Sequence, residues 1–282
     1  MIFVSSSCVK NKKIKDSIVE LANNGFRNIE LSGGTEDYDG IENDILELKD
    51  KYNLNLLCHN YFPPPKEHFV LNLASLNNEV YKRSFNHIVK AISLSEKISA
   101  PKFGFHAGFY IDIKVTDIGK KITKTELFNR EKCATRFCNA VLELQKTTSK
   151  VQLYIENNVY SEANFKTYNG EEVLMLTSSD KFVELSKKID FNLLLDIAHL
   201  KVSSKTLGLS FKEELAKMIN NSDYIHISDN DSLSDLNCTL EKDSILYKNI
   251  KNIDLKNKDI TVEIYDSIDK IKESCQLLEE LV

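Results

Sequence analysis

The sequence predicts an α/β fold, a single (β/α)8 TIM barrel whose one domain spans residues 1–282. Strand-like apolar runs alternate with amphipathic segments along the whole chain, and no linker or change of composition divides it. Alternation of this kind implies a parallel sheet that is covered by helices on both faces. Eight such strands and a length near ~250 residues indicate a closed barrel.

An open doubly wound sheet is the alternative, and it predicts a glycine-rich phosphate turn after the first strand. The chain has "SSSCVKNKK" at that place, without a glycine. The pair Gly33-Gly34 after the second strand is typical of a plain turn. The sequence therefore favours the closed barrel.

Eight runs rich in apolar residues are expected as strands. In chain order they are IFVSS (2–6), RNIELS (27–32), LNLLCHN (54–60), KFGFHAG (102–108), VQLYIEN (151–157), FNLLLDIA (191–198), DYIHISD (223–229) and DITVEIY (259–265). Apolar residues recur about every 3.6 positions in the segments between them, which predicts helices at 13–24, 40–52, 80–98, 127–147, 180–189, 211–221 and 267–282. The stretches 61–70 and 159–179 are expected as loops that shape a pocket.

Composition opposes several classes of protein. The net charge of −5 disfavours general binding to phosphate backbones, so we do not expect nucleic acid as a partner. No apolar run approaches the ~18 residues that cross a bilayer, so we expect no membrane association. Six scattered cysteines without a C-x-x-C pair fit reduced thiols. Because the short apolar start of the chain suits a first strand better than a signal peptide, we expect a cytoplasmic protein.

Acidic and imidazole side chains stand at the ends of the expected strands. Side chains of barrel strands alternate between the lumen and the helix layer, and chemistry occurs at the C-terminal ends. Counting back by twos places on the lumen side Glu30, His59, His106, Glu156, Asp196, His226 and Glu263. Any one of them alone has an ordinary explanation as a loop cap, a salt bridge or a core histidine, as His68 and His87 do. Four successive strands that end in this way indicate one shared site.

The last four strands supply the candidate metal ligands Glu156, Asp196, His226 and Glu263. Acids gathered at the dry end of a barrel would repel one another and take up protons unless a divalent cation held them. Three oxygens and one nitrogen suit Mn²⁺ or Mg²⁺ best, and Co²⁺ and Zn²⁺ remain open. We expect one such ion.

These strand ends resemble those of the xylose isomerase-like TIM barrels, a superfamily of sugar isomerases, ketose 3-epimerases, inosose dehydratases and apurinic-site endonucleases. The resemblance covers essentially the whole chain and is carried by residues 71–108 and by "LYIENN", "LLLDIAHLKVS", "YIHISDND" and "TVEIY", in this order. It implies the same metal tetrad. It also implies that His199 lies beside the substrate or a second metal, and that His59 and His106 contact substrate or an extra zinc.

The resemblance further implies a metal-dependent isomerase or epimerase of carbohydrate metabolism that acts on a sugar or sugar phosphate. Glu156 and Glu263 would take and return a proton next to a carbonyl, and the metal would stabilise the enediolate. His199 would hold a substrate oxygen. Lys201 either meets an anionic substrate group or is a solvated surface lysine.

Two other activities stay open, an apurinic-site endonuclease with up to three metals and a dehydratase or lyase on the same metal site. After "HISDN" the family commonly has an aspartate and then a histidine. Asp235 can stand for the acid, but Asn237 occupies the histidine's place, and an amide is a poor zinc ligand. The sequence thus opposes a three-metal endonuclease site. Such barrels often associate through their helices, so a homo-oligomer is also open.

Overall fold

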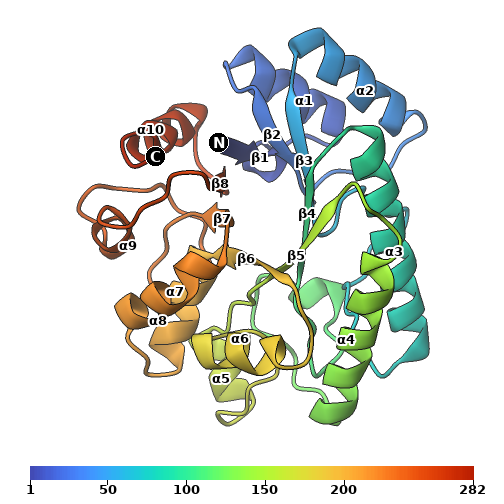
Figure 1. The fold of residues 1–282 in the computed structure, drawn as a ribbon, viewed down its shortest axis with the longest axis vertical. Coiled ribbons are helices and arrows are strands. Elements are labelled where there is room, and N and C mark those ends of the chain that lie inside the picture. The colour runs from blue at the N-terminus through green and yellow to red at the C-terminus, as the bar shows by residue number, and fades with distance from the viewer.

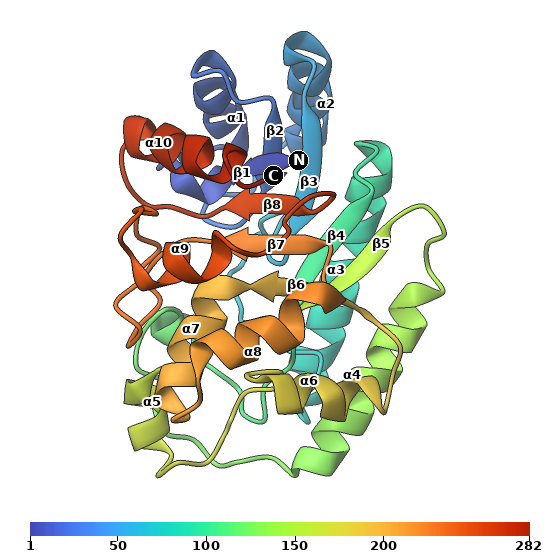
Figure 2. The ribbon, with the colours of Figure 1, turned by 60° about the vertical axis from the view of Figure 1, so that its left-hand side comes forward.

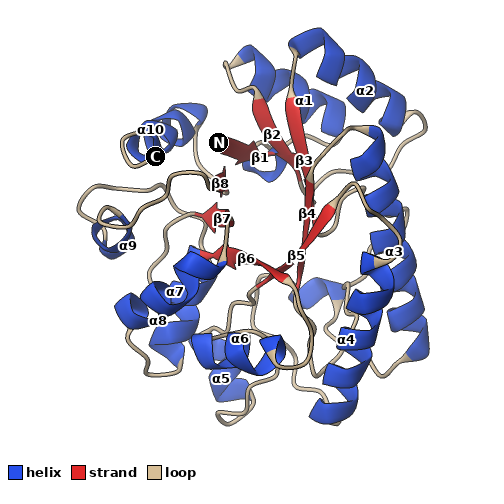
Figure 3. Ribbon diagram, in the orientation of Figure 1, coloured by secondary structure: helices blue, strands red, loops and turns tan.

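Eight parallel strands close into a barrel in chain order in a computed structural model that describes residues 1–282. The strands line the centre and the helices surround them (Figures 1 and 3). The strands are β1 (Ile2–Ser5), β2 (Asn28–Leu31), β3 (Asn55–His59), β4 (Lys102–His106), β5 (Gln152–Glu156), β6 (Asn192–Asp196), β7 (Tyr224–Ile227) and β8 (Asp259–Val262). The predicted (β/α)8 fold is confirmed.

The outer layer consists of helices of very different length. They are α1 (Ile14–Asn23), α2 (Ile41–Tyr52), α3 (Asn78–Lys97), α4 (Arg130–Gln145), α5 (Glu162–Thr167), α6 (Ser179–Ser186), α7 (Ile197–Thr206), α8 (Phe211–Met218), α9 (Ile245–Ile250) and α10 (Ile268–Glu279). Short 3-10 turns are η1 (Ser6–Cys8), η2 (Val115–Asp117) and η3 (Ile219–Asn221). No helix is both long and apolar enough to span a membrane.

Three of these helices differ from the sequence expectation. The predicted strand 191–198 is wrong at its end, because β6 stops at Asp196 and α7 begins directly at Ile197. The carboxylate of Asp196 accepts the backbone N–H of His199 at 2.7 Å, which caps the helix and turns the chain out of the sheet. The short helices α5 and α9 lie in segments without a predicted helix, since six residues are too few to establish a periodic pattern.

Alternation along the strands sends one set of side chains into the lumen. Tyr154 of β5 and Tyr224 of β7 pack inside the barrel, in a small cluster completed by Phe3, Leu57 and Leu194. Their neighbours Leu153, Ile155, Ile225 and Ile227 belong instead to the large apolar core between strands and helices. Because the period is two, the residue two positions after each lumen residue also faces inward. The strand ends therefore point into the barrel at its C-terminal end, called the mouth below.

At the opposite end of the lumen, the buried Lys102 pairs with two aspartates that reach the surface. The ammonium of Lys102 lies 2.9 Å from Asp259 Oδ2 and 3.2 Å from Asp223 Oδ2. The rings of Tyr154 and Tyr224 lie 5.2 and 5.6 Å from the same ammonium. These groups satisfy one another, so the unpaired polar chemistry of the lumen is at the mouth.

Helix α7 ties the mouth to the outer layer. It follows β6 without a loop, packs against β7, and lies beside α8 (Figure 2). All its residues from Ile197 to Ser204 are buried. The first turn of α7 is therefore held rigidly at the mouth, together with the His199 that it carries.

We expect Gly104→Ala to lower the free energy of unfolding by about 1–3 kcal/mol, because overpacking a filled core costs that much. A Cβ at Gly104 would lie 2.6 Å from Leu194 Cδ2 and 3.2 Å from His59 Cδ2. Urea unfolding measures the change. Gly33→Ala is the matched control, since its Cβ would meet only ordinary contacts with Tyr61 at 3.5 Å. Equal stability of the two variants would contradict this packing.

Candidate metal centre

Glu156, the last residue of β5, lies at the middle of the mouth and is buried. One carboxylate oxygen, Oε2, is 2.7 Å from His59 Nε2 and 3.2 Å from His106 Nδ1. The other, Oε1, is 3.6 Å from His199 Nδ1 and 3.7 Å from His226 Nδ1. A single carboxylate thus contacts imidazoles from three other strands and from α7.

The mouth holds three overlapping groups of metal-type ligands, in each of which the ligand atoms lie within 4.8 Å of one another. They are Glu30, His59, His226 and Glu263; His59, His106 and Glu156; and Glu156, Asp196 and His199. Of the four ligands predicted from sequence, Glu156 and Glu263 both face His226. No group contains all four: His226 and Glu263 belong to the first, Glu156 and Asp196 to the third, and the side chain of Asp196 turns toward His199. His59 is shared by the first two groups and Glu156 by the last two.

His226 has the orientation of a metal ligand. Its Nε2 faces Glu30 Oε1 at 3.0 Å. Its Nδ1 is buried without a hydrogen-bond partner and points between Glu263 Oε2, at 3.5 Å, and Glu156 Oε1, at 3.7 Å. A buried nitrogen between two carboxylate oxygens is costly unless it carries a proton or a cation. The donors present at this point, one imidazole and two carboxylates, fit a divalent ion.

Asp196 and His199 form the other side of the mouth. Asp196 Oδ2 lies 3.6 Å from His199 Nε2, and Asp235 Oδ2 from the loop after β7 lies 3.3 Å from the same nitrogen. The ring is oriented from behind, because its Nδ1–H donates to the backbone carbonyl of Asn157 at 2.9 Å. The structure therefore brings Asp235, His199 and Asp196 together. Asn237 does not join them, since its side chain accepts a hydrogen bond from Ser228 Oγ at 3.3 Å.

Asn157 is a residue of the mouth whose role was not predicted. Its side chain accepts the backbone N–H of Asp196 at 2.7 Å and donates to the backbone carbonyl of Asp196 at 2.9 Å. With its own carbonyl on His199, it fixes the first turn of α7 to β5. The only signal in the sequence is its place directly after Glu156 in "ENN".

Lys201 is not a solvated surface lysine, and that sequence-based alternative is wrong. Its ammonium is buried and lies 2.5 Å from Asp229 Oδ1, and it donates to the backbone carbonyl of Asn230 at 2.7 Å. Both partners belong to the loop after β7, which also carries Asp235. Lys201 thus anchors that loop to α7. A contact between Lys201 and substrate stays a prediction.

Charge at the mouth is balanced among acids and imidazoles. Burial alone would raise the pKa of Glu156, but His106 and His59 outweigh it and hold that pKa well below its usual value. His226 does the same for Glu263, whose pKa is lowered to about 2 despite burial. Burial raises the pKa of Asp196 to about 7, although His199 opposes the shift. Burial also lowers the pKa of His106 to about 4.

Only a few of these side chains are reached from outside. His106 and Asp235 are each 25% exposed and Glu263 is 14% exposed, whereas Glu30, Glu156 and His226 are at most 1% exposed.

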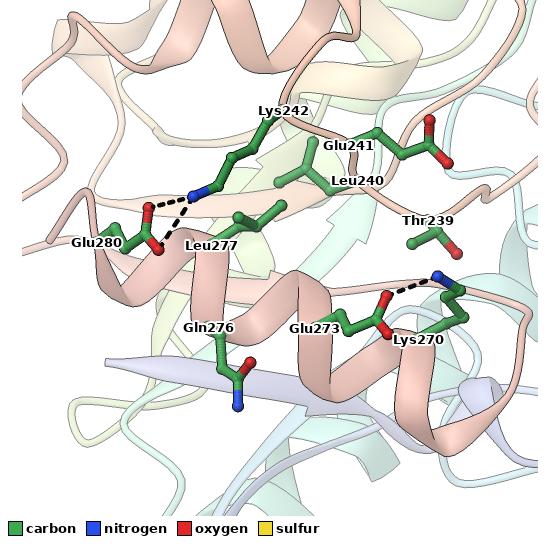
Figure 4. A pocket seen from close by; sticks show the side chains of 9 residues that line it. All are labelled: Thr239, Leu240, Glu241, Lys242, Lys270, Glu273, Gln276, Leu277 and Glu280. Atoms are coloured by element: carbon green, nitrogen blue, oxygen red, sulfur yellow. Dashed lines mark hydrogen bonds and ion pairs between the residues drawn. The ribbon is translucent and has the colours of Figure 1, made fainter.

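A separate surface hollow lies between α10 and the loop after β7 (Figure 4). Four of its five charged groups form ion pairs, Lys242 with Glu280 and Lys270 with Glu273, and only Glu241 has none. Unlike the mouth, it gathers no group of metal-type ligands.

Fold and site together define a TIM barrel with a candidate divalent-metal centre at its mouth. Residues 18–281 match the family described as Xylose isomerase-like TIM barrel, and the chain belongs to this family. Comparison by sequence with curated proteins finds no match.

Several solved structures share the fold at low sequence identity. A D-tagatose 3-epimerase-like protein is 18% identical, with a TM-score of 0.72 over 99% of this chain and 96% of its own. A D-psicose 3-epimerase with D-tagatose from Clostridium cellulolyticum is 12% identical, with a TM-score of 0.63 over 99% and 90%. Endonuclease IV from Thermus thermophilus is 13% identical, with a TM-score of 0.61 over 99% of both chains.

We expect Mn²⁺ to bind more tightly as the pH rises from about 6 to 8, because ligands must lose their protons to hold a metal. Asp196, with its pKa raised to about 7, is still protonated at the low end, so each pH unit below that value weakens binding up to about tenfold. Calorimetry at several pH values, in buffers of different ionisation enthalpy, measures affinity and proton release. Asp196→Asn should weaken binding and flatten the pH dependence. A constant affinity in the wild type would contradict the assignment.

We expect Lys201→Met to lower the free energy of unfolding by about 3–5 kcal/mol, since it leaves the buried Asp229 carboxylate unpaired. Urea unfolding measures the loss. The double variant with Asp229→Asn should recover most of it, because the uncompensated charge is then removed. If Lys201 contacted only substrate and not Asp229, both the single and the double variant would be nearly as stable as the wild type, which would contradict this prediction.

Proposed function

We propose that this protein is a divalent-metal-dependent isomerase or epimerase that acts on a sugar or sugar derivative. The observation that carries the proposal is the buried Nδ1 of His226, which lacks a hydrogen-bond partner and points between Glu156 and Glu263. Two acids on either side of a cation site can take and return a proton at a carbon whose C–H the cation acidifies. The family membership supports the same class of chemistry.

Glu156, Asp196, His226 and Glu263 would hold the ion. When bound, it polarises a substrate carbonyl and so acidifies the neighbouring C–H bond. Asp196 would have to turn its Oδ2 away from His199, while its Oδ1 can continue to cap α7. The identity of the metal stays open, and the mixed oxygen and nitrogen donors favour Mn²⁺ or Mg²⁺.

Glu156 and Glu263 are the proposed acid–base pair. One carboxylate takes a proton from the carbon next to the carbonyl, and the other returns a proton. Delivery to the opposite face of the same carbon inverts its configuration, whereas delivery to the neighbouring carbon exchanges ketose and aldose. Both carboxylates have lowered pKa values and are weak bases, so they depend on an acidified substrate.

The histidines of the mouth are the proposed contacts to substrate oxygens. His199 is held by Asn157 and directs Nε2 toward the interior of the mouth. His106 turns its buried Nδ1 toward Glu156 at 3.2 Å, while its side chain is 25% exposed at the mouth. A polyhydroxylated substrate supplies hydroxyl groups that can pair with such nitrogens.

We expect the wild-type protein with Mn²⁺ to place solvent deuterium at a carbon next to the carbonyl of at least one ketose when a panel of sugars is incubated in heavy water. Glu156→Gln and Glu263→Gln should each lower the exchange rate by about 10²–10⁴-fold, as loss of a general base does. Nuclear magnetic resonance and mass spectrometry measure the exchange. Glu279→Gln, on the exposed face of α10, is the control and should leave the rate unchanged.

An apurinic-site endonuclease is the second candidate, and the grouping of His59 and His106 with Glu156 is the observation that favours it. That activity predicts several bound metals per chain and nicking of a duplex with one abasic site. We expect one metal and no nicking. Cleavage of abasic DNA without deuterium exchange into any sugar would reverse the order of the two candidates.

A further inference from the structure

Glu30, near the end of β2, is a fully buried carboxylate at the floor of the mouth. Its Oε2 accepts the hydroxyl of Thr261 at 2.8 Å and the hydroxyl of Tyr224. Nε2 of His226 lies between the two oxygens, hydrogen-bonded to Oε2 at 3.2 Å and 3.0 Å from Oε1. Oε1 also faces the hydroxyl of Ser32 at 3.4 Å and, more distantly, Nδ1 of His59 at 3.9 Å. A buried charge with no lysine or arginine beside it requires such a complete set of donors.

These hydrogen-bond donors surround the carboxylate of Glu30. Two oxygens offer about four acceptor positions, and four donors surround them, namely three hydroxyl groups and the imidazole N–H that lies between the two oxygens. A metal ion at Glu30 would have to displace one of these buried groups. Although Glu30 belongs to one of the groups of metal-type ligands, its lone pairs are thus already used within the protein.

We propose that Glu30 is a positioning residue for the metal ligand His226. By accepting Nε2–H it holds the proton on that nitrogen and leaves Nδ1 as the lone pair that faces Glu156 and Glu263. Tyr224 and Thr261 lie on the lumen side of β7 and β8 and fix the carboxylate from below. A carboxylate on the far nitrogen also makes the imidazole a stronger donor to a cation.

The inference rests on the proposed metal centre. It assigns one ring nitrogen of His226 to the metal ion and the other to Glu30. It predicts that Nδ1 of His226 binds the ion and Nε2 keeps its proton. It also predicts that the metal affinity depends on a residue that never touches the ion. Loss of such an outer partner typically weakens metal binding by about 10–100-fold.

The test compares the wild-type protein, Glu30→Gln and Glu214→Gln by zinc affinity, zinc stoichiometry and nitrogen-15 resonances of histidine in the zinc-loaded protein. Glu214 is the matched control, since it is a buried carboxylate that accepts hydrogen bonds from Ser179, at the start of α6 and away from the mouth. We expect Glu30→Gln to bind zinc about 10–100-fold more weakly at unchanged stoichiometry, and Glu214→Gln to bind like the wild type. In the wild type, the His226 resonances should show a protonated Nε2 and a metal-bound Nδ1.

Three results would overturn the inference: zinc bound to Nε2 of His226, equal affinity of Glu30→Gln and the wild type, or loss of one whole zinc ion from Glu30→Gln, which would make Glu30 a ligand. The resonance assignment in the wild type decides the matter even if Glu30→Gln fails to fold. A wild-type protein that binds no divalent ion would overturn the proposed function as well, whereas tight binding by both proteins would overturn the role of Glu30 alone.

Discussion

The concentration of acids at the mouth is the constraint on which the rest of this structure depends. Five carboxylates, from Glu30, Glu156, Asp196, Asp235 and Glu263, lie within 4 Å of imidazole nitrogens, and none of them pairs with a lysine or arginine. Removing such charges from water costs several kcal/mol per group unless opposite charge compensates it. Histidine supplies that compensation conditionally, because it can exchange its proton for a metal. The protons on these histidines therefore balance the negative charge at the mouth, and a bound cation can replace them.

The barrel makes this concentration possible by rigid packing beneath it. Tyr154, Tyr224 and Leu194 fill the lumen, and Gly104 leaves the space that the side chain of Leu194 occupies, with the ring of His59 next to it. The polar groups are then held one by one, Glu30 by hydroxyl groups from below and Asp196 by Asn157 from the neighbouring strand. Each holding contact joins residues far apart in sequence. The geometry of the site is thus a property of the closed sheet and not of any single motif.

Helix α7 sets the two halves of the site apart. One half contains Glu156, His226 and Glu263, and the other contains Asp196, His199 and Asp235. Because it starts directly after Asp196, the carboxylate of that residue serves at once as a helix cap and as a neighbour of His199. The buried pair of Lys201 and Asp229 then brings the loop after β7 against the same helix and carries Asp235 to His199. A cation drawn to Glu156, His226 and Glu263 would compete with His199 for Asp196. Ion binding would therefore change whether the Asp196 carboxylate faces His199 or the ion.

The sequence by itself determined the alternation of strands and helices, the closed barrel, and the identity of the polar residues at the strand ends. The alternation and the strand ends follow from local periods of 3.6 and two residues, and the closed barrel follows from the count of eight strands and the chain length. The tertiary structure alone decided the partners of Lys201, the hydrogen bonds of Asn157 to Asp196 and the position of Glu30 beneath His226. Those features depend on contacts between residues far apart in sequence, such as Thr261 with Glu30. No local period contains them, because closure of the sheet is what brings the groups together.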